Sequence, residues 1–160
     1  LEEFKKELEK IENCKGLPHF QRALTMGASC GVFGLMFVPT ATYLDFIITF
    51  LITLVIYYGM VFLNKYELNA FISNALLSIV MTVLAAIGVN YHIASDIDTI
   101  VIGTIMILVP GVAVTNAVRD VINGDILSGT IRTLEAFIVA FGIAFGVGIT
   151  LFFLKRGGLL

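Results

Sequence analysis

Five long apolar stretches separated by short polar segments dominate the chain. They cover residues 23–38, 46–63, 68–89, 97–118 and 134–154. Most approach the roughly 20 residues that a helix needs to cross about 30 Å of hydrocarbon, and the first reaches that length only with its neighbours. Bilayers admit only helices or closed barrels, and these stretches lack the alternation of barrel strands. The pattern predicts an all-α, polytopic membrane protein, with about five transmembrane helices within residues 20–160.

The first 15 residues have a different pattern, in which charged residues surround a single apolar stripe. The stripe repeats at helical spacing and consists of Leu1, Phe4, Leu8 and Ile11. Gly16 and Pro18 then stop the helix. We expect residues 1–19 to form an amphipathic cytoplasmic helix and linker. Because the chain starts with Leu1 and a charged segment, not a signal peptide, we expect it to be a fragment of a longer protein, or its ordered part.

The distribution of basic residues predicts the orientation in the membrane. With a cytoplasmic N-terminus, eight of the ten Lys and Arg residues lie inside, and only Lys155 and Arg156 lie outside. The loops assigned to the outside carry Asp45, Asp96 and Asp98 and no basic residue. We therefore expect a multi-pass protein of the cell (inner or plasma) membrane with its N-terminus in the cytoplasm.

Composition agrees with the membrane assignment and excludes several functions. Of 160 residues, 58% are hydrophobic and 14% charged, whereas soluble domains have about 45–50% and 25%. The net charge is −2 and no basic stripe is present, which argues against a nucleic-acid partner. Cys14 and Cys30 read as free thiols. His19 and His92 lack partners at metal-ligand spacing, so neither a metal site nor a cofactor is expected.

Small and polar residues inside the apolar stretches predict helix packing. Two pairs at i, i+4 allow close approach of helix backbones: Gly27 with Gly31, and Gly142 with Gly146. We expect Asn69 and Asn74 to hydrogen-bond a neighbouring helix, and Asp45 to act at a helix N-terminus.

Residues 109–135 carry the candidate chemistry, beginning with a helix break. Pro110 and Gly111 interrupt the fourth apolar stretch. A proline there removes a backbone hydrogen bond, and the freed carbonyl needs another partner. An interrupted hydrophobic segment of this kind is a sequence pointer to the binding site of a transporter.

The polar residues after the break share helical faces. The first face holds Asn116, Arg119, Asp120 and Asn123, and the second holds Ser128, Arg132 and Glu135. An arginine at the bilayer centre costs about 3 kcal/mol, so such residues line water, pair with one another or lie at the interface.

These residue types suggest a solute site. The guanidinium of Arg119 suits a carboxylate, and Asn116 and Ser128 are expected to contact the polar part of the substrate. Asp120 takes part in substrate binding, and Asp120 or Asp125 carries a coupling proton if burial raises its pKa. Arg132 and Glu135 are expected to form a supporting pair.

A second interpretation of the same residues is a plain cytoplasmic loop over residues 119–132. Asn123-Gly124 is a turn signal, and Asp125 is a suitable helix N-cap. The two interpretations overlap, because a polar helix end beneath a broken helix is where a cytoplasmic gate for a solute would lie.

The stretch over residues 108–136 resembles the threonine/serine exporter family, with its PG, NA-x-RD, GD-x-x-SG and R-x-x-EA elements. The resemblance extends more loosely over nearly the whole chain and matches the N-terminal membrane half of the family. It implies ten membrane helices as two five-helix halves, in one chain or in two subunits, with a soluble domain before the first half. Residues 1–19 would then be the tail end of this soluble domain, which is missing here. It also implies proton-driven export of threonine and serine; split two-subunit relatives are linked to succinate-like dicarboxylates. The motif positions are Pro110, Gly111, Asn116, Arg119, Asp120, Gly124, Asp125, Ser128, Gly129, Arg132 and Glu135.

We therefore expect half of a secondary exporter for small polar metabolites, with a second five-helix subunit or another copy of the chain as its partner. The alternative is a membrane scaffold or sensor subunit that transports nothing. A membrane enzyme is disfavoured, since no histidine belongs to the polar cluster.

Overall fold

A computed structural model describes residues 18–66 and 68–158, and this part of the chain is helical throughout apart from its connections. The expected amphipathic helix over residues 1–15 lies outside the described residues. The described helices are α2 (His19–Phe37), α3 (Tyr43–Asn64), α4 (Ala70–Asn90), α5 (Ile97–Leu108), α6 (Gly111–Ile122) and α7 (Ile126–Arg156).

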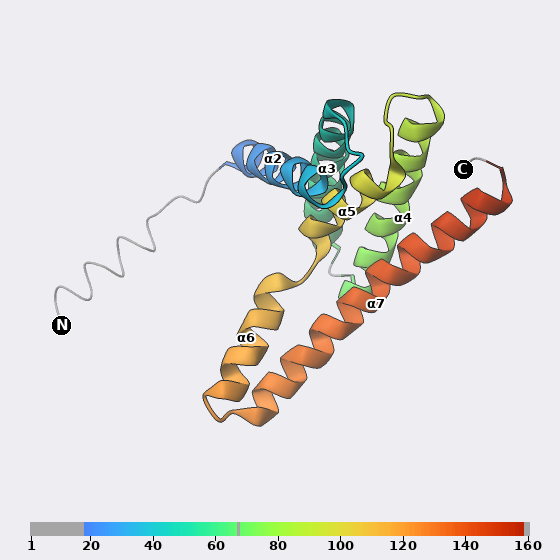
Figure 1. Cartoon of the computed structure of the whole chain (residues 1–160). Coiled ribbons are helices and arrows are strands. Elements are labelled where there is room, and N and C mark those ends of the chain that lie inside the picture. Colours follow the sequence, from blue (N-terminus) through green and yellow to red (C-terminus); the bar gives the residue numbers. More distant parts are fainter. Residues whose placement is uncertain (1–17, 67, 159–160) are drawn as a thin grey trace, which may run out of the picture.

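The helices form a bundle from which one hairpin extends (Figure 1). Helices α2 to α5 pack on one another, and α4 packs along α7. Helix α6 packs on the first half of α7, and these two segments project away from the other helices as an antiparallel pair (Figure 1). At about 1.5 Å per residue, the 31 residues of α7 extend about 46 Å, longer than the hydrocarbon layer.

Fewer spans are supported than the five expected. Helices α3, α4 and α7 are long and apolar enough to cross a membrane, and the bent pair of α5 and α6 passes the same test as one unit. That makes three spans, or four with the bent pair. Helix α2 is not among them. Its first turns carry the polar residues His19, Gln21 and Arg22, which offset the apolar residues that follow.

Polar caps, not the ends of the apolar stretches, determine where most helices begin. Thr42 forms a capping box with Asp45 at the start of α3. Side-chain oxygens of Asn69, Asp96 and Asp125 accept backbone hydrogen bonds at the starts of α4, α5 and α7. As a result α7 begins at Ile126, well before residue 134, where the apolar stretch starts.

Asp45 does more than the N-terminal role expected of it. Its carboxylate is fully buried. Its Oδ2 accepts from the backbone N–H of Thr42 at 2.7 Å, and its Oδ1 accepts from the N–H of Ser95 at 2.7 Å. One side chain thus ties the connection between α4 and α5 to the start of α3.

The expected close packing at the glycine pairs is confirmed. A Cβ atom on Gly142 would lie 2.8 Å from the carbonyl oxygen of Phe71 in α4, and one on Gly146 would lie 2.5 Å from that of Ala75. Gly27 and Gly31 lie in the same way against phenylalanine side chains of α3. Only a residue without a side chain allows these helix backbones to approach so closely.

The expectation for Asn69 and Asn74 was wrong, because each bonds its own helix. Asn69 Oδ1 accepts from the N–H of Phe71 at 2.9 Å, and Asn74 Nδ2 donates to the carbonyl of Ala70 at 2.8 Å. Asn69 caps a free N–H of the first turn of α4, and Asn74 bonds back to the carbonyl four residues earlier, as short polar side chains in helices do.

Candidate functional site

The fourth apolar stretch is broken at Val109 and Pro110, where the sequence analysis places a helix break. Helix α5 ends at Leu108, α6 begins at Gly111, and their axes are bent by 54°. The N–H of Gly111 turns back to the carbonyl of Val109 at 2.8 Å. No side chain caps α6, so backbone N–H groups of its first turn remain available at the break.

After α6 the chain forms a tight helical hairpin instead of an extended loop. Of residues 119–132, only 123–125 are outside a helix. The predicted turn is present, with Gly124 in the left-handed region at φ 90°. A Cβ atom on Gly129 would lie 2.9 Å from the carbonyl oxygen of Ala117 and would collide with Val121. The glycine therefore allows α6 and α7 to pack closely just after the turn.

Asp125 caps α7, as the loop interpretation expected. Its Oδ1 accepts from the N–H of Ser128 at 3.1 Å, and its Oδ2 accepts from the Ser128 hydroxyl at 2.7 Å. These two bonds lower the pKa of the exposed Asp125 carboxyl, and the nearby charge of Arg132 adds a smaller effect. Asp125 and Ser128 thus bond to each other at the start of α7.

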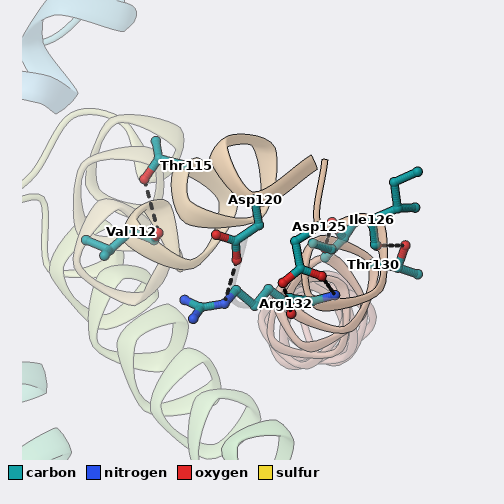
Figure 2. A network of polar contacts seen from close by, with 10 residues as sticks. Val112, Thr115, Asp120, Asp125, Ile126, Thr130 and Arg132 are labelled. Atoms are coloured by element: carbon teal, nitrogen blue, oxygen red, sulfur yellow. Dashed lines mark hydrogen bonds and ion pairs between the residues drawn. The ribbon is translucent and has the colours of Figure 1, made fainter. Parts of the chain in front are cut away.

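An ion pair joins the two helices of the hairpin (Figure 2). Arg132 Nε in α7 lies 3.0 Å from Asp120 Oδ2 in α6. The contact has the distance of an ion pair, although its angle does not meet that of a hydrogen bond. The Asp120 side chain is 27% exposed and that of Arg132 49%. Arg132 was expected to pair with Glu135, but within the described residues its ion pair is to Asp120.

The other charged candidates are free within residues 18–66 and 68–158. Arg119 is exposed in the last turn of α6 and makes no ion pair there, and the same holds for the exposed Glu135 in α7. Asn116 is partly buried. The structure thus joins Asp120 with Arg132 and Asp125 with Ser128, and leaves Arg119 apart.

Two adjoining cavities lie at the helix break. One has a volume of about 300 Å³ and the other of about 390 Å³, and Ala70, Pro110 and Val139 line both. Polar lining comes from the end of α3, the start of α4 and from α7: Asn64, Asn69, Ser73, Asn74 and Glu135. Such concave sites with a few polar groups are typical binding sites for small molecules.

Sequence reasoning missed the contribution of α4 to these cavities. Asn69 and Asn74 were assigned to helix packing, and Glu135 to a pair with Arg132. The available signal was weak. Three asparagines, Asn64, Asn69 and Asn74, lie where α3 ends and α4 begins, but nothing in the sequence indicates that this connection lies beside Pro110.

The sequence of the chain matches the model of a known protein family. The model of the ThrE family, the threonine/serine exporters, matches residues 1–154. The chain belongs to the threonine/serine exporter family. No curated protein and no solved structure matches it. As a ThrE member with long apolar helices it is a multi-pass membrane protein of a transporter family, and the match includes the broken helix and the hairpin.

Proposed function

We propose that this ThrE chain is half of a secondary exporter that moves threonine, serine or a similar small polar metabolite out of the cell. The observation that carries the proposal is the juxtaposition at Pro110, where a helix broken by 54° adjoins two cavities with polar lining. Discontinuous helices of this kind form the substrate sites of many secondary transporters.

The proposed mechanism is alternating access, with the break as the hinge. Helix α5 packs within the bundle, and the Asp45 carboxylate holds the connection before it. Helix α6 packs chiefly on α7. The hairpin is therefore free to change its angle to α5 while the backbone packing of α6 on α7 at Gly129 stays intact.

In this mechanism Arg119 binds the carboxylate of the solute, and Asn116 and Ser128 contact its polar part. These three residues lie outside the lining of the two cavities, on the hairpin that adjoins them. Asp120 carries the coupling proton. Protonation would remove its charge and release Arg132, which would loosen the ion pair between α6 and α7. We assign this role to Asp120 rather than Asp125, because Asp120 pairs with Arg132 across the two helices of the hairpin, whereas Asp125 bonds Ser128 at the start of α7.

A second five-helix half, as a separate subunit or another copy of this chain, would complete the transporter. Apolar side chains on the hairpin support this proposal, since Val112, Ile122 and Leu127 are 76%, 77% and 74% exposed. We place the assembly in the inner membrane with the N-terminus in the cytoplasm. A succinate-like dicarboxylate is the alternative solute.

The test is efflux of labelled threonine, serine and succinate from proteoliposomes under an imposed proton gradient. It uses the full-length protein together with its second half. We expect gradient-driven efflux of one solute class, lost in Arg119→Ala and retained in the matched control Arg156→Ala, which removes an exposed arginine at the far end of α7. No efflux of any solute would favour the scaffold function, and efflux that survives Arg119→Ala would remove Arg119 from the site.

A further inference from the structure

We propose that Glu135 binds the ammonium group of the solute in the cavity beside Pro110. This role would make the site selective for α-amino acids over dicarboxylates. The inference rests on the proposed function and deepens it, since it names the side chain that distinguishes the two solute classes.

Glu135 is available to bind a ligand. Arg132, one turn earlier on α7, is the expected partner of Glu135, but it lies 3.0 Å from Asp120 instead. Within the described residues Glu135 forms no ion pair and no side-chain hydrogen bond. It lines the larger of the two cavities together with Ala113 of α6. An unpaired carboxylate in a cavity is a binding group for a cation.

The second step is the charge of the lining. Among the described residues that line the two cavities, Glu135 is the one with a charged side chain. A dicarboxylate with one carboxylate on Arg119 would bring its second carboxylate to this space, where no described lining residue is a cation. An α-amino acid would bring an ammonium group, which an ionised carboxylate favours.

The third step is the hydrogen-bonding capacity of the remaining lining. Asn69 uses its oxygen to cap α4, which leaves its NH2 group as a donor. Asn74 uses its nitrogen on the carbonyl of Ala70, which leaves its oxygen as an acceptor. The hydroxyl of threonine or serine both donates and accepts, so it can use either group.

The test compares L-serine with glycerate, in which a hydroxyl group replaces the amino group, and with succinate. The test uses reconstituted full-length protein with its second half. We expect Glu135→Gln to raise the KM for serine at least tenfold and to change the KM for glycerate little. Glu135→Asp should recover part of the loss. Asp98→Asn, which removes an exposed carboxylate at the start of α5, is the matched control and should behave as wild type.

A binding measurement keeps the test independent of turnover. In a variant without native cysteines, Ala113→Cys places a thiol at the cavity, and serine should slow its modification by a maleimide when Glu135 is present but not in Glu135→Gln. Unchanged KM and unchanged protection in Glu135→Gln would overturn the role of Glu135 while export itself stands. Glu135-dependent protection without any gradient-driven efflux would instead reject the proposed export and retain the binding site.

Discussion

Arg132 Nε lies 3.0 Å from Asp120 Oδ2, across the two helices of the hairpin. If Asp120 carries the coupling proton, Asp120→Asn should abolish efflux driven by a proton gradient but leave exchange of labelled for unlabelled solute close to wild type. Exchange needs the substrate site and the moving helices, but no net proton transfer. Both rates can be measured in the same proteoliposomes.

Asp125→Asn is the matched control, because it neutralises a carboxylate in the same hairpin. Asparagine is also a good N-cap, so helix α7 should keep its start and coupling should be unchanged. The assignment to Asp120 would be contradicted if both variants lost coupling equally, or if neither variant lost it. The ion pair itself should add little to stability, on the order of 1 kcal/mol or less, since both side chains are partly exposed.

The all-helical class and the break could be predicted from the sequence, because apolar length and a proline act locally, but three or four spans are supported instead of the five expected. Pro110 removes a backbone donor whatever surrounds it, and the break lies there. Asp125 is followed by Ser128 at the spacing of a helix cap, and that contact is also local.

The partners of the charged residues depended on packing and could not be predicted in the same way. Arg132 has Glu135 three residues away on its own helix, but it is close to Asp120 because Gly129 allows α6 to approach α7. The residues that line the cavities could not be predicted for a similar reason. The start of α4 lies next to Pro110 because α4 packs on both α5 and α7.

Gly129 should be intolerant of any side chain. A Cβ atom would lie 2.9 Å from the carbonyl of Ala117 and would collide with Val121. We expect Gly129→Ala to destabilise the protein by about 1–3 kcal/mol, as overpacking does. Gly148→Ala on the same helix is the control, because nothing lies within 4 Å of its Cβ position. It should be neutral or stabilise by up to about 1 kcal/mol. Thermal unfolding in detergent measures both, and equal melting temperatures would contradict the close approach.

The start of α7 should depend on pH through Asp125. Hydrogen bonds from Ser128 lower the pKa of this carboxyl below its ordinary value of 3.8. A group whose pKa is lowered by folding stabilises the fold fully above its unfolded value, and the effect disappears as the pH falls through its folded value. Hydrogen-exchange protection of residues 126–130, corrected for intrinsic rates, should therefore be constant at neutral pH and fall below about pH 4. Asp125→Asn should remove this pH dependence, and Asp125→Ala should lower protection at every pH. A loss of protection near pH 6 in wild type would point to another titrating group.

Replacing Pro110 should test the hinge directly. Pro110→Ala restores a backbone N–H and removes the ring that clashes with a continuous helix. We expect α5 and α6 to straighten from their 54° bend. Efflux should fall at least tenfold, because a continuous helix closes the cavities and removes the hinge. Spin labels at exposed positions of the two helices, such as Ile102 and Val118, report the angle as a distance distribution. Pro39→Ala, in the connection between α2 and α3, controls for the loss of a proline elsewhere. Normal efflux by a straightened Pro110→Ala variant would mean that the bend is a packing feature and that the moving part lies in another segment.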